Sequence, residues 1–502
     1  MLDQIRHVVV LMLENRSFDN ILGGLYGGGR PSVFVPPSNT DPVDGIVDAN
    51  GTVKASCRNP SNPAYLVDPD GHDPRWVQAK LGVAGSILHN LYVTPYHDPD
   101  ELFDHMTFQI FGRQQVDAGA RPEPSMDGFW VDFRNHHPLS LRSTIDQIME
   151  SFSPVQLPII SGLAQGYAVS DRWFASCPTQ TYPNRAFVNA GTSLGFVNND
   201  QSHTFDTPTI YNWIEEGNRR NGTNHTFGVY YGDYSITWLT LPQARQTSRG
   251  DAIFQRHEAF FEALQGPNPT LPTYTFLEPN YIIEVESEHP PFNVARGEGF
   301  LAEVYSALAG SPIWDNLLFV VTYDEHGGCY DHVPPPWGAI PPDDHTQEGF
   351  GFDRFGVRVP TVFVSPYIAE GTVIRSSTDQ PFDHCSLLKT IGGWLGLPPE
   401  GLPSARVNAE ETPTFENVLT SSTPRQPVGL HPPPPVHGGG DDSRPIGALQ
   451  SSIVASVAAQ RHEADPSQPT SSDVTSRVTT VADAIQYLGL STQSGTQPTP
   501  GR

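Results

Sequence analysis

The sequence predicts an α/β protein whose central sheet is mostly parallel and covered by helices on both faces. Apolar runs of strand length occur singly between helical stretches, and they are almost continuously apolar, as in strands buried on both faces. The strand candidates are residues 6–13, 227–231, 273–277, 317–323 and 359–365. The helix candidates are residues 157–166, 252–264, 299–309 and 384–395. Polar residues directly follow two of the strand candidates, where open α/β sheets usually bind their ligands.

The charge of the chain disfavours one class of partner. Its 502 residues include 55 acidic and 29 basic side chains, which gives a net charge of −26. This field repels nucleic acid and anionic lipid surfaces, so we expect no nucleic-acid partner. No apolar run approaches the roughly 20 residues that cross a bilayer, and no leader precedes the first strand candidate. We therefore expect a soluble, cytoplasmic protein, or a secreted or periplasmic one if a leader has been removed; the oligomeric state is not predicted.

The composition divides the chain near residue 422. Proline and glycine runs predict a linker over residues 422–443. Residues 1–421 form the predicted catalytic domain, in which a long insert at 27–74 is expected to form loops over one sheet edge. Residues 444–502 form a predicted helical appendage. The four cysteines are too far apart for a CxxC pair, so we expect neither a disulfide framework nor a thiolate zinc site.

Two strand candidates end in potential metal ligands. Residues 7–13 are followed by Glu14 and Asn15, and then by a helix start at Ser17. Residues 317–323 are followed by the adjacent carboxylates Asp324 and Glu325, which repel each other unless a cation or a hydrogen-bond donor is present. The glycine pair after His326 permits a close backbone approach. We predict a metal site here; the alternative is that the carboxylates only fix a loop through backbone N–H groups.

A threonine is the candidate nucleophile. Pro183 suits the first turn of a helix, which sets Thr181 just ahead of the helix N-terminus, where backbone N–H groups favour an alkoxide and a phosphate. Coordination to a cation activates such a hydroxyl. The alternative is that Thr181 only caps the helix. Thr179 is the next candidate nucleophile.

Several histidines form a candidate set of phosphate ligands and proton donors. A single histidine is more often a surface or core residue, but these lie in loops that flank the ends of predicted elements. They are His72, His289, His326, His332 and His384.

These motifs resemble the phosphoesterase family that includes bacterial phospholipases C, plant non-specific phospholipases C and the acid phosphatase AcpA. The matching stretches run in consistent order from residue 5 to about 397. They are residues 14–19, 126–129, 178–185, 276–279, 289–291, 322–334 and 383–384. Two features depart from the family pattern. The bacterial enzymes often have Gly-Pro before the threonine, whereas this chain has Thr179-Gln180, which is closer to the plant pattern. The segment between His72 and Met126 is longer than the family pattern leads us to expect.

The resemblance implies a three-layer, alkaline-phosphatase-like α/β/α fold. It also implies one divalent metal ion, held by Glu14, Asn15, Thr181, Asp324 and Glu325. Thr181 is implied as the nucleophile. The implied residues around the phosphate are His72, His289 and His384, and His326 is a further catalytic candidate.

The predicted function is that of a metal-dependent phosphoric ester hydrolase, most specifically a phospholipase C that releases a phosphorylated head group. Oxygen ligands suit Mg²⁺, Ca²⁺ or Mn²⁺, while the nearby histidines leave Zn²⁺ or Fe as alternative metal ions. One alternative is an acid phosphatase for soluble phosphomonoesters, and another is a non-catalytic protein that binds phosphate ligands. A G-x-S-x-G pattern around Ser193 also suggests a serine hydrolase, but that motif requires a preceding strand, and here a helix is predicted.

Overall fold

The computed structural model describes residues 2–82, 92–117, 119–200, 204–436 and 443–490. Residues 437–442 of the predicted linker and 491–502 of the predicted appendage lie outside this part. Within the described ranges, no helix combines the length and apolarity that a membrane span requires. The cysteines are free and buried, so the described residues contain no disulfide.

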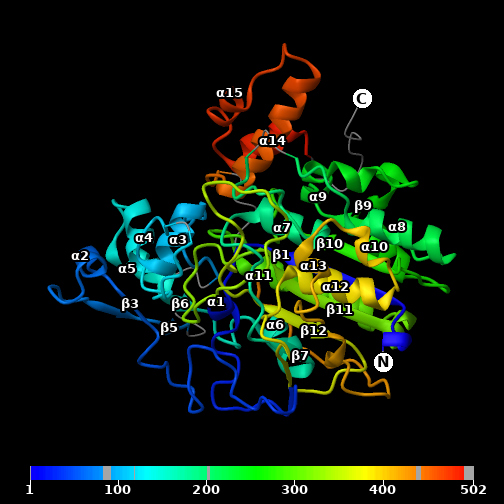
Figure 1. The fold of residues 1–502 in the computed structure, drawn as a ribbon, viewed down its shortest axis with the longest axis horizontal. Helices are drawn as coiled ribbons and strands as arrows, with labels where there is room; N and C mark the ends of the chain where they lie inside the picture. Colours follow the sequence, from blue (N-terminus) through cyan, green and yellow to red (C-terminus); the bar gives the residue numbers. More distant parts are fainter. Residues whose placement is uncertain (1, 83–91, 118, 201–203, 437–442, 491–502) are drawn as a thin grey trace.

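In the described part of the chain, nine strands form the main sheet in the order β2-β13-β7-β12-β11-β1-β10-β8-β9 (Figure 1). Their bounds are β1 His7–Leu13, β2 Val33–Val35, β7 Ala168–Ser170, β8 Phe227–Tyr231, β9 Phe254–Arg256, β10 Tyr274–Glu278, β11 Leu317–Tyr323, β12 Thr361–Val364 and β13 Thr372–Ile374. Only β12 is antiparallel to its neighbours, and the other pairings of this sheet are parallel. The predicted fold class is confirmed.

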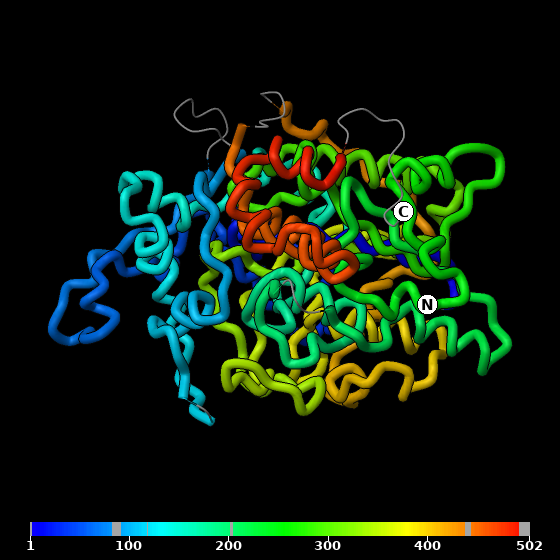
Figure 2. Tube along the Cα trace, turned by 90° about the horizontal axis from the view of Figure 1, so that it is seen from above, coloured from blue at the N-terminus to red at the C-terminus, as the bar shows by residue number. Residues whose placement is uncertain are grey.

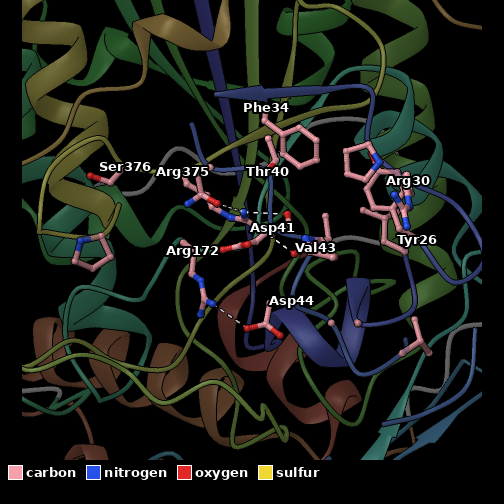
Figure 3. A pocket seen from close by; sticks show the side chains of 18 of the residues that line it. Tyr26, Arg30, Phe34, Thr40, Asp41, Val43, Asp44, Arg172, Arg375 and Ser376 are labelled. Carbon is pink, nitrogen blue, oxygen red and sulfur yellow. Dashed lines mark hydrogen bonds and ion pairs between the residues drawn. The ribbon is translucent and has the colours of Figure 1, made fainter. Parts of the chain in front are cut away.

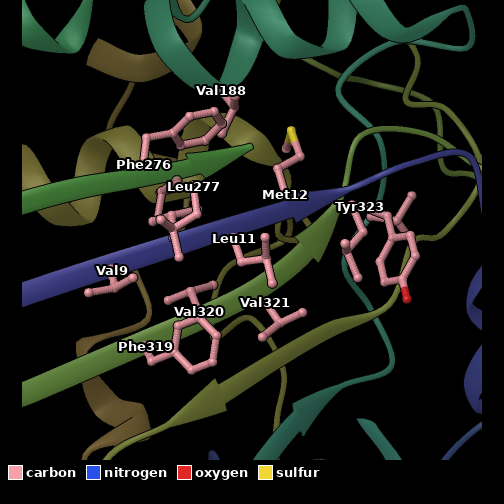
Figure 4. Packing of buried hydrophobic residues seen from close by; sticks show 14 of the residues in the cluster. Val9, Leu11, Met12, Val188, Phe276, Leu277, Phe319, Val320, Val321 and Tyr323 are labelled. Carbon is pink, nitrogen blue, oxygen red and sulfur yellow. The ribbon is translucent and has the colours of Figure 1, made fainter. Parts of the chain in front are cut away.

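The helices form two packed groups, one on each face of the sheet. In one group α6 (Pro158–Gly166) contacts α11 (Val294–Ala309), which contacts α10 (His257–Leu264). In the other, α7 (Thr181–Ala190) contacts α9 (Ile236–Thr240) and α12 (His384–Trp394). Figure 4 shows Val188 of α7 lying over Met12 and Phe276 of the two central strands. The other α-helices are α1 Phe18–Leu22, α2 Pro63–Val67, α3 Phe103–Phe111, α4 Phe129–His136, α5 Arg142–Ile145, α8 Ile210–Asn221, α13 Ala405–Asn408, α14 Ala448–Ala464, α15 Ser471–Thr475 and α16 Val481–Leu488.

Four short strands were absent from the sequence prediction: the edge strands β2 and β9, and also β7 and β13. The predicted helix 252–264 begins only at His257, because residues 254–256 form β9 against β8. The predicted loop insert 27–74 supplies β2, which pairs with β13 at the other edge. Each of these strands has three residues, which is too short for an apolar periodicity to be recognised. The insert also contributes β3 (Arg58–Pro60), which pairs with β4 (Trp76–Gln78), while β5 (Lys80–Leu81) pairs with β6 (Glu150–Ser151).

The C-terminal helices pack on the rest of the protein. Leu449, Ile453 and Val454 of α14 belong to the same buried cluster as the apolar residues of the central strands. Seen from above, α14 crosses the middle of the molecule (Figure 2). Its burial therefore ties the C-terminal segment to the layer that contains α7.

Candidate active site

Strand register brings the two acidic motifs together. β1 and β11 are parallel neighbours in which Leu13 is paired with Tyr323, so Glu14-Asn15 and Asp324-Glu325 emerge side by side. The backbone N–H of Asn15 donates to Asp324 Oδ1 at 2.9 Å across 309 sequence positions, and its side-chain amide donates to Glu325. All four side chains are fully buried.

The glycine after His326 is required by this contact. Gly327 has a φ of +62°, and a Cβ placed there would lie 2.0 Å from the carbonyl oxygen of Asn15. Its backbone N–H donates to Glu325 Oε2 at 2.6 Å. The predicted close backbone approach is confirmed, and it holds the two strand ends against each other.

The hydroxyl of Thr181, at the start of α7, points toward the side chains that follow β1. Its Oγ1 lies 3.3 Å from Asn15 Oδ1 and 3.4 Å from Glu14 Oε2. Gln180 is the N-cap of α7, so Thr181 is the first helical residue and not the residue ahead of the helix. The capping role considered for Thr181 is therefore wrong. The hydroxyl of Thr179 donates instead to the carbonyl of Val197.

A buried arginine that the sequence analysis missed completes the cluster. Arg185 lies one helical turn after Thr181, and its Nε donates to Glu14 Oε1 at 2.7 Å. Its Nη1 lies 3.5 Å from Glu278 Oε1 at the end of β10. The signal available in the sequence was the spacing of four residues within the helix, which places the two side chains on the same face.

The cluster carries more negative than positive charge. Burial raises the pKa of Glu14 well above its usual range, although Arg185 opposes this shift. Burial and the neighbouring Asp324 raise the pKa of Glu325 in the same direction. Asp324 Oδ2 is buried without a hydrogen-bond partner among the described residues. Buried oxygens in this condition fit a hard divalent cation, which prefers carboxylate, amide and hydroxyl oxygens.

Three of the predicted histidines lie at or beside this cluster. The Nε2 of His384, the first residue of α12, lies 2.7 Å from the carbonyl oxygen of Asp324. His326 Nε2 lies 2.8 Å from Gln109 Oε1, and its Nδ1 lies 3.7 Å from Glu325 Oε2. The third histidine is His289. Burial lowers the pKa of all three imidazoles, and the pKa values of His289 and His326 fall to about 3. They are therefore neutral, and His289 lies next to Glu101, whose pKa is raised by burial and by the charge of Glu325.

His72 is not brought to this cluster, and its predicted place there is wrong. It is exposed in the turn between α2 and β4, and this excursion projects away from the sheet (Figures 1 and 2). The polar Asp-Gly-His-Asp sequence around His72 predicts a turn, but it does not show whether that turn faces a binding site or solvent. His332, from the wider candidate set, belongs to a separate buried cluster with Asp19 and Asp331.

The serine-hydrolase pattern does not form a nucleophile elbow. α7 runs to Ala190 and ends at Gly191, so a helix and not a strand precedes Ser193. The Ser193 hydroxyl donates to the carbonyl of Phe196 at 2.8 Å. Asp331, which follows Ser193 in the chain and would be the acid of such a triad, is paired with Arg358 at 2.9 Å. The sequence-based rejection of this motif is confirmed.

A large cavity of about 1140 Å³ lies elsewhere (Figure 3). None of the predicted site residues lines it. Two of the arginines that line it already form ion pairs within the protein: Arg172 with Asp44 at 2.8 Å, and Arg375 with Asp171 at 2.6 Å. Its size alone therefore does not make it the catalytic centre.

Helix α14 packs against residues that neighbour this cluster. The backbone N–H of Ala448 donates to Asp98 Oδ2 at 2.7 Å, and Gln450 Nε2 donates to the carbonyl of Tyr281 at 2.9 Å. Ser456 lies 3.3 Å from the hydroxyl of Tyr182, the residue after Thr181. These contacts bring α14 close to Thr181 and to the loop that carries Asp98.

Comparison with known proteins identifies the family of this chain. Residues 5–398 match the model of the phosphoesterase family. The chain belongs to the phosphoesterase family. It is therefore a phosphoric ester hydrolase by class, as its sequence predicted.

Named relatives of this phosphoesterase occur in plants and bacteria. Non-specific phospholipase C3 of Arabidopsis thaliana is 32% identical over 77% of this chain and 69% of its own length. Phospholipase C B of Mycobacterium tuberculosis is 26% identical over 86% of this chain and 81% of its own. Among solved structures, an alkaline phosphatase superfamily protein from Vibrio parahaemolyticus gives a TM-score of 0.31 at 13% identity, covering 51% of this chain and 65% of that one. The sheet order, and not this last likeness, carries the fold assignment.

Proposed function

We propose that this phosphoesterase cleaves phospholipids as a phospholipase C, with Thr181 as its nucleophile. The observation that supports the proposal is the convergence of Thr181 Oγ1 on the side-chain oxygens of Glu14 and Asn15, at 3.4 and 3.3 Å. The names of the plant and bacterial relatives support the choice of phospholipid as substrate.

The residues present fit one divalent cation. Glu14, Asn15, Thr181, Asp324 and Glu325 would hold it, since all five offer oxygen donors and Asp324 Oδ2 has no hydrogen-bond partner among the described residues. Such an ion supplies a lower pKa for the hydroxyl and neutralises charge on the phosphoryl oxygens.

The protein groups carry out the displacement. Thr181 Oγ1 gives up its proton and forms a bond to phosphorus while the bond from phosphorus to the lipid alcohol oxygen breaks, and the released proton is passed to that alcohol oxygen. Water then attacks the phosphothreonine, which releases the phosphorylated head group and restores the hydroxyl. Arg185 holds Glu14 in position, and His384 holds the Asp324 backbone. His326 lies beside Glu325 as a further positioning residue.

The second candidate is an acid phosphatase for soluble phosphomonoesters. The observation that favours it is the net charge of −26, which repels anionic membrane surfaces. Release of choline phosphate from phosphatidylcholine and of phosphate from p-nitrophenyl phosphate, each with and without chelator, separates the two. Activity on neither substrate would contradict both candidates.

The nucleophile is tested with a matched pair of variants. Thr181→Ala is expected to lower kcat by about 10⁴-fold or more, because no hydroxyl remains to attack. Thr179→Ala is the control, since its hydroxyl donates to the carbonyl of Val197 and not to the cluster. Circular dichroism checks that both variants fold. Substantial activity in Thr181→Ala, with loss in Thr179→Ala, would move the nucleophile to residue 179.

A further inference from the structure

A second group of metal-ligand side chains lies beside the proposed cation site. Asp98, Glu101 and His289 each present one ligand atom, and these atoms lie within 4.8 Å of one another. His289 Nε2 is 3.4 Å from Glu101 Oε1, and its Nδ1 is 3.7 Å from Asp98 Oδ1. Glu101 and His289 are buried, and the Asp98 side chain is 19% exposed.

Hydrogen bonding leaves acceptor atoms facing one another in this group. The Nδ1 of His289 contacts the carbonyl oxygen of Pro290, which fixes the proton on Nδ1 and leaves a lone pair on Nε2. That nitrogen, both oxygens of Glu101 and Asp98 Oδ1 have no hydrogen-bond partner among the described residues. A nitrogen lone pair and a carboxylate oxygen at 3.4 Å repel each other unless a proton or a metal cation lies between them, and the ion count below distinguishes the two.

No protein cation in the described residues fills this position. Arg16 and His136 both act electrostatically on Asp98. Arg16 donates through Nε and Nη1 to the carbonyls of Glu288 and Thr94 and to the side chain of Asn20. Its Nη2 has no hydrogen-bond partner among the described residues, and the ion pairs of Asp98 and Glu101 in this part of the chain are with His289 and not with Arg16. His136 pairs with Asp100 at 2.9 Å. The charge of Glu325 adds to the negative potential at Glu101.

We propose that Asp98, Glu101 and His289 bind a second divalent cation, of the zinc or manganese class. Two carboxylates and one imidazole suit these ions better than Mg²⁺ or Ca²⁺, which prefer oxygen ligands alone. Three protein ligands leave a position open for water or a phosphoryl oxygen, as in catalytic zinc sites. The partly exposed Asp98 gives the ion a route of entry. Binding of this ion stands independently of the proposed function, and only its role toward a phosphoryl oxygen rests on it.

The test counts bound ions and does not depend on activity. Protein stripped with chelator is titrated with Mn²⁺ and, separately, with Zn²⁺, and the stoichiometry is measured by calorimetry and by elemental analysis after dialysis. We expect two ions in the wild type, one in Glu101→Gln, one in Asp324→Asn and none in the double variant. His332→Asn, from the buried cluster paired with Arg358, is the control and keeps two.

Each other pattern has a separate meaning. One ion in the wild type that is lost in Asp324→Asn but kept in Glu101→Gln overturns the second site and leaves the proposed function intact. One ion lost in Glu101→Gln but kept in Asp324→Asn supports the second site and contradicts the first. No ion in the wild type overturns both. If Glu101→Gln does not fold, Asp98→Asn replaces it, with an expected loss of affinity of about tenfold or more.

Discussion

Two buried groups of carboxylates and histidine in this protein are built from the same residue types but are neutralised differently. In the first, Arg358 lies 3.0 Å from Asp19 and 2.9 Å from Asp331, and His332 spans Asp19 and Asp44 at 2.6 and 3.0 Å. Every charged group of this cluster, hereafter the closed cluster, has an ionic partner. The closed cluster stabilises the packing of α1 and the segment after β11.

The second group, hereafter the open centre, contains the strand-end carboxylates and the neighbouring Glu101 and His289. Its only ion pairs to an arginine, among the described residues, are those of Arg185 with Glu14, Glu278 and Asp324. Asp324 Oδ2 and both oxygens of Glu101 remain without hydrogen bonds in the described structure. The comparison teaches that a histidine–carboxylate group indicates a metal site only where buried protein cations do not already balance it.

The largest expected difference between the two groups is in catalysis. Asp324→Asn should lower kcat by about 10²–10³-fold, since it removes charge from the proposed cation site. Asp331→Asn should lower it less than tenfold, because its partner Arg358 lies in the closed cluster. Initial rates on phosphatidylcholine, corrected for the folded fraction, measure both. Equal losses would remove the functional distinction between the groups.

The next largest difference is in stability. Arg358→Met should lower the free energy of unfolding by about 3–5 kcal/mol, because it leaves Asp19 and Asp331 buried without their cation. Glu325→Gln, measured in cation-free protein, should change it by less than about 1 kcal/mol, because it also relieves repulsion with Asp324. Urea unfolding followed by circular dichroism provides the values. A greater cost for Glu325→Gln than for Arg358→Met would reverse the assignment.

Divalent cations should stabilise the open centre alone. At an ion concentration about 100 times the Kd of each site, every occupied site should add about 2.7 kcal/mol relative to chelator-treated protein. Asp324→Asn should lose the share of the site at the strand ends and keep the share of the Asp98–Glu101–His289 site, while His332→Asn should keep both. Unfolding curves with Mn²⁺ and with chelator test this, and an undiminished gain in Asp324→Asn would place the first ion elsewhere.

The smallest predicted effect is a pH dependence of the closed cluster. Burial opposes protonation of His332, but Asp19 and Asp44 raise its pKa from 6.5 to about 9. Its stabilisation is therefore fully present below pH 6.5 and is lost as the pH rises through 9. Between pH 7 and 9 the wild type should lose about 2 kcal/mol more than His332→Asn. Parallel pH profiles of the two proteins would show that His332 does not titrate in this way.

The sequence predicted the central architecture well because the signals there are local. The apolar runs of β1 and β11 are each followed at once by polar residues, so their place at the end of a strand was readable without tertiary information. The three-residue strands β2, β7, β9 and β13 carried no such signal. The metal ligands and the nucleophile stay predictions, although Glu14, Asn15, Thr181, Asp324 and Glu325 do converge.

The amino-acid sequence determined the alternation of buried strands and helices. It also determined which carboxylate, amide and hydroxyl side chains follow the strands. Tertiary structure decided which side chains meet. Pairing of Leu13 with Tyr323 brings the acidic motifs level, while His72 is carried outward and Glu101 arrives from the loop before α3. Whether Arg358 or Arg185 balances a given carboxylate depends on contacts across hundreds of positions. Such contacts are fixed by long-range packing, which no local pattern encodes.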